Sequence, residues 1–253
     1  MSVSILSESD LVKIREAARI SAAALKYGGE QIKAGMTTKQ LDKLIHAFII
    51  HQGAKPNFLG YGGFPASACI SINDEIIHGI PSKKRVIREG DIVTIDVGAE
   101  YEGFNGDNCA TFPVGHISDE AKKLLEDTEA SLYEGIKAAQ PGNRIGDIGH
   151  AVEQYLIDTG RHYGIVRDYC GHGIGRDMHE SPDIPNYGVS GHGPRLIPGM
   201  CICIEPMVNL KGDDVRVLKN GWTVVTASGS LSCHFEKQLE ITENGPKIIS
   251  VCD

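Results

Sequence analysis

The sequence predicts an α+β protein built from two similar halves that a pseudo-twofold axis relates. The first observation behind this prediction is a pair of amphipathic helical segments that recurs 107 positions later, so that Gly35 falls on Gly142 and Gly53 falls on Gly160. The second observation is a β-prone run that recurs after each pair and ends in a carboxylate. Self-similarity of this kind indicates a repeated structural unit.

Each helix in the repeat has its own signals. Residues 8–33 carry apolar side chains at helical spacing, which predicts the first helix. Thr37 and Gln40 have the spacing of a capping box and predict a second helix that ends at Gly53. Ser118 is placed to cap a third helix over residues 121–139, and the apolar spacing of residues 145–160 predicts the fourth.

The strands of the two halves also align. Residues 88–96 match residues 197–205 at a shift of 109 positions, and both runs are introduced by a glycine. Asp96 closes the first run and Glu205 closes the second. We therefore expect halves of approximately 1–112 and 113–253. Because neither half carries a complete site, we expect them to form a single catalytic domain over residues 1–253.

The composition of the chain argues against nucleic-acid-binding and membrane proteins. The chain has 253 residues and a net charge of −8, which disfavours nucleic acid as a direct partner. Its seven cysteines show no Cys-x-x-Cys pair, and charged residues arrive early at the N-terminus. No apolar run approaches the roughly 20 residues that span a bilayer. These features favour a cytoplasmic protein without a membrane partner, and we expect a monomer.

Asp96 and Glu205 stand out because acidic side chains are costly in apolar strands unless a cation or strong donors meet them. Taken alone, each could be a solvated residue at a strand end. Their equivalence in the repeat favours a shared cation near the pseudo-twofold axis. Asp107 follows Asp96 on what the sequence predicts to be the return strand of a hairpin, and Glu236 occupies the corresponding late position in the second half.

A glycine-rich segment supplies the one histidine that we group with these acids. Residues 171–175 place three glycines around His172, which allows the backbone to crowd a ligand or substrate. One imidazole with four carboxylates suits Mn, Fe, Co or Zn in a paired site better than a structural zinc site. It is also the donor set that a two-metal hydrolytic site needs.

At this point the chain resembles the methionine aminopeptidases of the bacterial type I class. The resemblance is carried in order by residues 71–81, 95–98, 106–112, 171–175, 178–180 and 204–207, and by the segment up to Glu236. It implies the pita-bread fold, with the two halves around a mainly antiparallel, curved sheet. It also implies a metalloaminopeptidase that removes the initiator methionine from nascent proteins and peptides.

The resemblance implies two divalent metals per chain and a role for each site residue. Asp96 would chelate one metal, His172 and Glu205 the other, and Asp107 and Glu236 would bridge both. A water or hydroxide between the metals would attack the first peptide bond. His179 would stabilise the oxyanion, His78 would lie near the leaving nitrogen, and Glu205 would act as general acid and base.

An apolar slot would hold the methionine side chain, whose thioether packs well against aromatic rings. The resemblance implies a lining of Phe58, Tyr61, Phe64, Cys69, Met178 and Trp222. Three positions depart from the family pattern: Phe58 replaces a common cysteine, Gly62 an occasional histidine and Met178 a common phenylalanine. We assign no site role to the other histidines, which are His46, His51, His116, His150, His162, His192 and His234.

Two alternatives remain. A proline-specific peptidase of the same fold would share the ligands but normally carries an additional N-terminal domain, for which the early motifs leave no room. A metal-free binding module of this fold would typically have lost ligands that are present here. Type II methionine enzymes insert a subdomain between their two glutamates, whereas only 31 positions separate Glu205 from Glu236. Any ribosome contact would have to use the catalytic domain.

Overall fold

The computed structural model describes residues 3–252 as an α+β fold whose strand pairs are antiparallel. The first half of the chain contributes α1 (Glu8–Gln31), α2 (Thr38–His51), the 3-10 turn η1 (Tyr61–Gly63), β1 (Ala68–Ile72), β2 (Glu75–Ile77), β3 (Ile92–Tyr101) and β4 (Phe104–Pro113). The second half contributes α3 (Asp119–Ala138), α4 (Ile145–Asp158), β5 (Gly164–Ile165), β6 (Gly171–Gly173), β7 (Glu180–Ile184), β8 (Cys201–Ile204), β9 (Met207–Asn209), β10 (Val215–Val217), β11 (Val224–Thr226), β12 (Ser232–His234), β13 (Lys237–Thr242) and β14 (Gly245–Ile248).

The four expected helices are confirmed, with small shifts at their ends. Thr37 and Gln40 form the capping box of α2, and Ser118 accepts the hydrogen bond that caps α3. The first helix stops at Gln31 rather than at residue 33, and the chain then turns through Gly35, which has a φ of 89°. A left-handed conformation of this kind favours glycine.

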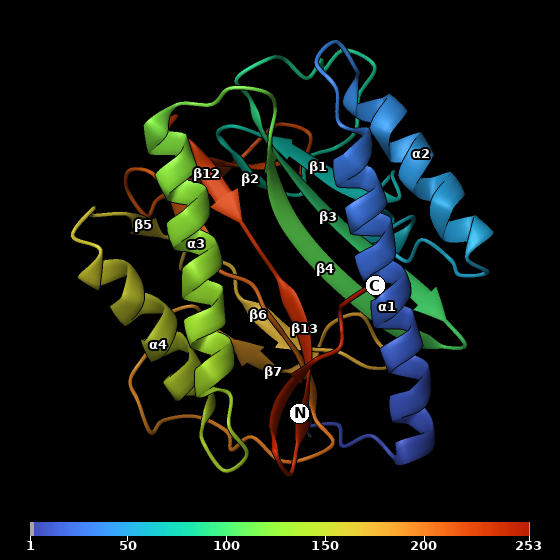
Figure 1. Ribbon diagram of the computed structural model, residues 1–253, viewed down its shortest axis with the longest axis vertical. Coiled ribbons are helices and arrows are strands. Elements are labelled where there is room, and N and C mark those ends of the chain that lie inside the picture. Colours follow the sequence, from blue (N-terminus) through green and yellow to red (C-terminus); the bar gives the residue numbers. More distant parts are fainter. Residues whose placement is uncertain (1–2, 253) are drawn as a thin grey trace.

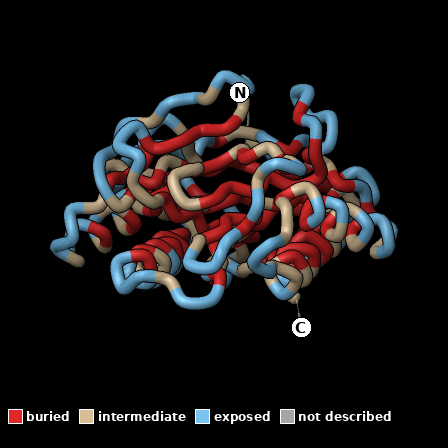
Figure 2. The backbone as a smooth tube through the Cα atoms, turned by 90° about the horizontal axis from the view of Figure 1, so that it is seen from above, coloured by how far each residue is buried: buried red, intermediate tan, exposed pale blue. Residues whose placement is uncertain are grey.

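The helices lie in two pairs beside the strands. Figure 1 shows α1 and α2 together on one side, α3 and α4 together on the other, and β13 passing between them. Helix α1 packs on β3 and β4, while α3 contacts α4, β8, β9 and β12. Seen from above, the buried backbone forms a band through the middle of the molecule and exposed loops surround it (Figure 2). The helices and sheets therefore enclose the strands that carry the acidic residues.

The strands form a five-stranded sheet in the order β14-β13-β8-β6-β7 and three sheets of three strands. The hairpin of β3 and β4 pairs without interruption from Ile92 and Pro113 to Tyr101 and Phe104. The sequence predicted that the β-prone segment 88–96 ends at Asp96, but strand β3 continues to Tyr101. The other run ends as expected, because β8 stops at Ile204 and Pro206, which has no N–H to pair, follows Glu205.

The first-half hairpin is joined to the second half at the level of the acids. The backbone N–H of Glu236 donates to the carbonyl of Cys109 at 2.9 Å. Gln238 is fully buried; its Oε1 accepts from the backbone N–H of Asp107 at 3.0 Å, and its Nε2 donates to the carbonyl of Asn105 at 3.3 Å. These bonds fix the distance between the two sets of carboxylates. Within residues 3–252, no helix has the length and apolar character needed to cross a bilayer.

Candidate metal centre and active site

Strand pairing brings the first-half acids to one point. Asp96 lies opposite Cys109 across β3 and β4, and Asp107 lies opposite Gly98, two positions along the same hairpin. Cys69, on β1, is the partner of Asp96 on the other side of β3. Side chains two residues apart share a strand face. The hairpin therefore presents both aspartates on the same face of the sheet.

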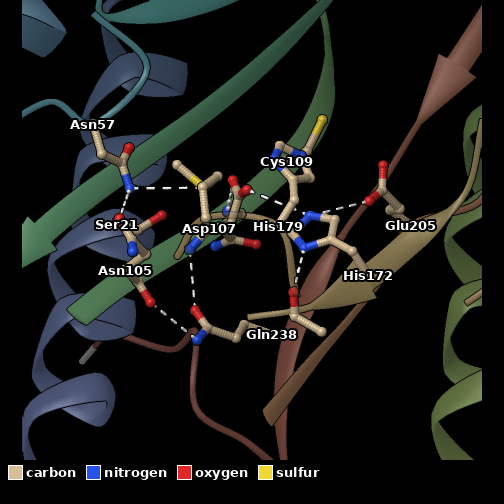
Figure 3. A network of polar contacts seen from close by, with 12 residues as sticks. Ser21, Asn57, Asn105, Asp107, Cys109, His172, His179, Glu205 and Gln238 are labelled. Carbon is tan, nitrogen blue, oxygen red and sulfur yellow. Dashed lines mark hydrogen bonds and ion pairs between the residues drawn. The ribbon is translucent and has the colours of Figure 1, made fainter. Parts of the chain in front are cut away.

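The second half brings its donors to the same place. Glu205 directly follows β8, Glu236 directly precedes β13, and these strands pair so that Lys237 faces Ile204. His172 lies in β6, where its Nε2 is 3.5 Å from Oε1 of Glu205 and 3.9 Å from Oδ2 of Asp107. Figure 3 shows Asp107, His172 and Glu205 pointing toward one another, with Gln238 beside Asp107. All five predicted ligands are therefore gathered at one centre.

The glycines on either side of His172 allow neighbouring backbone to pack closely, as the sequence predicted. A side chain at Gly171 would collide with the carbonyl of Cys203, and one at Gly173 would collide with that of Ser181. The Nδ1 of His172 is 2.9 Å from the carbonyl oxygen of Gly173. A carbonyl can only accept, so Nδ1 carries the hydrogen and Nε2 offers its lone pair to the acids. His172 is thus oriented as a metal ligand would be.

The electrostatics of the centre point to a missing positive charge. Burial, together with the charge of Glu236, raises the carboxyl pKa of both Asp96 and Asp107 well above the usual range. Burial raises the pKa of Glu205 to about 8, and burial with the Glu205 charge raises that of Glu236. Oδ1 of Asp96 and Oε1 of Glu236 are buried without a hydrogen-bond partner. Like charges this close need a cation to stay ionised together.

The residues present fit a divalent cation. Ligand atoms of Asp107, His172, Cys203 and Glu236 lie within 4.8 Å of one another, and all four residues are buried. Burial lowers the pKa of His172 to about 3, which leaves its imidazole neutral and able to ligate. Hard oxygen donors with a nitrogen are the set that divalent transition metals take.

Two residues at the centre were missed by sequence reasoning. Cys203 lies in β8, two positions before Glu205, and its Sγ is within 4.8 Å of ligand atoms of Asp107, His172 and Glu236. His234, which had been given no site role, lies two positions before Glu236 with its Nε2 3.4 Å from Oε2 of Glu205. The spacing of two residues from a predicted ligand was the available signal, because it places a side chain on the same strand face.

A cavity of about 190 Å³ opens beside the acids and has a largely apolar wall. Its lining includes Phe58, Tyr61, Phe64, Cys69 and Trp222, together with His78, His179 and the acids. The rings of Phe64 and Trp222 meet edge to face with centroids 5.2 Å apart. Met178 belongs to the hydrophobic cluster behind this wall and lines an adjoining pocket instead. Five of the six residues expected around the methionine slot thus lie on the cavity.

The two expected catalytic histidines lie on this cavity as well. His179 is exposed, and its Nδ1 is 2.8 Å from the hydroxyl of Tyr61, so its other nitrogen is free of that contact. His78 holds the unusual φ of 57° and meets the rings of Tyr169 and Trp222 edge-on. Left-handed backbone at a residue other than glycine is uncommon and is frequent at functional sites.

The comparisons with known proteins agree with this geometry. Residues 12–243 match metallopeptidase family M24. The chain is 47% identical over 249 residues to the methionine aminopeptidase of Clostridium acetobutylicum, covering 98% of this chain and 99% of that one.

Solved structures agree as well. The crystal structure of methionine aminopeptidase from Rickettsia prowazekii has a TM-score of 0.96 and 39% identity, covering 99% of this chain and 100% of that one. Prolidase from Pyrococcus furiosus shares the fold alone, with a TM-score of 0.77 and 23% identity, and this chain covers only 66% of its length. The expected pita-bread fold is confirmed. The chain belongs to metallopeptidase family M24 and, within it, to the methionine aminopeptidases.

Proposed function

We propose that this chain removes the N-terminal methionine from peptides and nascent proteins. The observation that carries the proposal is the small cavity whose wall is aromatic on one side and whose other side is the cluster of acids and His172. A side chain of methionine size would enter the apolar part, and its flexible thioether suits aromatic edges. The peptide bond that follows would then lie against the carboxylates.

Two divalent ions fit the donor set best. Asp96 would chelate one ion, His172 and Glu205 would hold the other, and Asp107 and Glu236 would bridge them. When bound, such ions polarise the peptide carbonyl and lower the pKa of water. Mn, Fe, Co and Zn all accept these ligands. Titration of the metal-free protein with Mn²⁺ should reach two ions per chain.

The chain's own residues position the substrate and move protons. Glu205, which lines the cavity beside His172 and His234, would take up and release a proton as general base and acid. His179, held by the Tyr61 hydroxyl, would donate to the oxygen of the scissile carbonyl as charge develops there. His78 would contact the leaving nitrogen.

Turnover of Met-Ala-Ser and of an Xaa-Pro dipeptide tests this assignment. We expect metal-dependent release of free methionine from the first peptide and little or no hydrolysis of the second. Hydrolysis of the Xaa-Pro dipeptide alone would replace our proposal with the proline-specific one. The metal-free binding module is tested by metal analysis of His172→Ala, for which that alternative requires no change in metal content.

The remaining expectations complete the proposal. We propose a cytoplasmic monomer in which residues 1–112 and 113–253 are repeated halves of one catalytic domain. Size-exclusion chromatography with light scattering measures the oligomeric state, and a mass twice that of the 27.3 kDa chain would contradict the monomer.

A further inference from the structure

His234 is a buried imidazole that the sequence motifs do not explain. It ends β12, its exposed fraction is 1%, and it lines the cavity together with the acids. Thr111 holds its backbone on both sides: the hydroxyl accepts from the N–H of His234 at 3.1 Å and donates to its carbonyl at 2.9 Å. The ring is therefore fixed in place by the first-half hairpin.

The two ring nitrogens of His234 have different surroundings. Nδ1 is 3.3 Å from Sγ of Cys109, which is also buried. Nε2 is buried and makes no hydrogen bond with the described residues, although Oε2 of Glu205 lies 3.4 Å away. The Cys109 thiol can donate to Nδ1 at this distance, and the carbonyl oxygen of His234, 3.7 Å from the same Sγ, is its other acceptor. Donation to Nδ1 leaves the ring hydrogen on Nε2. The unpaired Nε2 therefore has the Glu205 carboxylate as a near neighbour without a formed hydrogen bond.

Glu205 lies between two imidazoles that face its two oxygens. His172 approaches Oε1 at 3.5 Å and His234 approaches Oε2 at 3.4 Å. The carbonyl of Gly173 fixes the hydrogen of His172 on Nδ1, whereas donation from the thiol of Cys109 places that of His234 on Nε2. The two rings thus present opposite tautomers to one carboxylate. One offers a lone pair and the other offers a hydrogen.

We propose that His234 is a positioning residue: its Nε2–H holds Oε2 of Glu205, and the Cys109 thiol fixes the tautomer that makes this possible. The proposal rests on the proposed function, in which Glu205 is both ligand and proton carrier. Hydrogen bonds in a substrate-free site are often long and tighten only in the reacting complex. Substituting a residue that orients a metal ligand in this way typically lowers metal affinity or activity by about 10- to 100-fold.

Substitutions at residue 234 can distinguish whether the side chain acts as a hydrogen-bond donor or as an imidazole ligand to metal. Glutamine can place an amide N–H where the imidazole has Nε2, whereas the shorter asparagine reaches only the position of Nδ1. We expect H234A and H234N to weaken Mn²⁺ binding by about 10- to 100-fold and to lower kcat on Met-Ala-Ser to a similar degree. H234Q should recover both quantities to within about threefold of the wild type. The KM should change little in all three variants.

Matched controls isolate the effect of position. H46A and H46Q change a half-buried histidine on α2 that contacts Ser67 and lies outside the site, so neither should alter Mn²⁺ affinity. C109S keeps a donor for Nδ1 and C109A removes it, so the second should weaken Mn²⁺ binding more than the first. Calorimetric titration with Mn²⁺ needs no substrate, so it tests the positioning role even if the protein fails to hydrolyse Met-Ala-Ser.

The tautomers can be observed directly in the metal-free protein. Two-bond ¹⁵N–¹H spectra of protein labelled at histidine should show His234 protonated on Nε2 and His172 on Nδ1. The proposal is overturned if H234A binds Mn²⁺ as tightly as the wild type, if H234Q is as impaired as H234N, or if His234 is protonated on Nδ1. A wild-type protein inactive on Met-Ala-Ser would instead overturn the proposed function and leave the Mn²⁺ series to decide the role of His234.

Discussion

The two halves deliver their acids to the centre in different ways. In the first half, Asp96 and Asp107 both lie inside a continuous hairpin of ten-residue strands. In the second half, Glu205 and Glu236 lie just outside β8 and β13, which have four and six residues. Asp96 has a paired strand on each side, and Asp107 is held by pairing with β3 and by the bond from its backbone N–H to Gln238. The glutamates lie outside the paired strands and are positioned more by the side chains around them.

The second half compensates with polar partners. It supplies His172, Cys203 and His234, all buried and all within reach of the two glutamates. The first half contributes Cys109, whose thiol contacts His234. Both halves thus place two acids at the centre, but the side chains around those acids differ between the halves. Paired substitutions in the two halves therefore test where their surroundings matter and where they do not.

The largest expected loss of activity comes from substituting Asp107 and Glu236, the second acid of each half. Asp107→Asn and Glu236→Gln should each lower kcat/KM on Met-Ala-Ser by more than about 100-fold, because even residues that only orient a ligand cost 10- to 100-fold. Metal analysis should show a loss of bound ions in both. Glu126→Gln, on the exposed face of α3, is the control. Either variant retaining activity within tenfold of the wild type would remove that residue from the bridging pair.

The second prediction concerns pH in the metal-free protein. Burial raises the pKa of Glu205 from 4.5 to about 8, so the stability that its proton contributes is full below pH 4.5 and is lost as the pH rises toward 8. Burial lowers the pKa of His172 from 6.5 to about 3, so its contribution is lost only as the pH falls from 6.5 toward 3. Above about pH 6.5 the carboxylates therefore dominate.

We expect the Tm of chelator-treated protein to fall between pH 6.5 and 8.5. Protein saturated with Mn²⁺ should gain in Tm relative to it over the same range, because metal binding needs ionised carboxylates. At a thousandfold excess over Kd the ion adds about 4 kcal/mol of stability. Glu205→Gln should flatten the pH dependence of the metal-free protein, and an unchanged slope in that variant would contradict the assignment.

The third prediction compares Cys203 with Thr94, its counterpart at the shift of 109 positions. Cys203→Ala removes a thiol that lies within 4.8 Å of ligand atoms of Asp107, His172 and Glu236, and should weaken Mn²⁺ binding about tenfold. Thr94 is bonded to the hydroxyl of Thr111 at 2.8 Å. Thr94→Val should leave Mn²⁺ affinity within about threefold and cost about 1 kcal/mol in the free energy of unfolding. Equal Mn²⁺ affinities in both variants would argue against a special role for the thiol.

The smallest expected effect tests whether the two cores are equally well packed. Ile95 and Ile204 occupy equivalent positions beside the acids; both are fully buried, in separate hydrophobic clusters. Ile95→Val and Ile204→Val should each lower the free energy of unfolding by about 1 kcal/mol, the usual cost of removing one buried methylene. Urea denaturation measures both. A difference of more than about 1 kcal/mol would show that one half packs less tightly than the other.

The sequence by itself predicted the four helices, the acid-bearing strands and the five candidate ligands that the fold gathers at one centre. Local signals are enough for these features: helical and strand periodicity, capping residues, and acids in segments too apolar to bury them alone. Sequence reasoning missed His234, because its spacing of two from Glu236 suggests a shared strand face but does not show which of ten histidines is buried against a carboxylate. It could not separate Cys203 from six other cysteines for the same reason.

Only the tertiary structure decided how the halves meet. The pairing of Cys109 with Glu236 and the bonds of Gln238 to Asn105 and Asp107 set the spacing of the carboxylates. The same contact between halves gives His234 its partners, Thr111 and Cys109, from a strand more than 100 residues earlier. Acids reveal themselves locally because burying a charge is costly anywhere. The tautomer of an imidazole depends on which atoms the fold brings within about 3 Å of it.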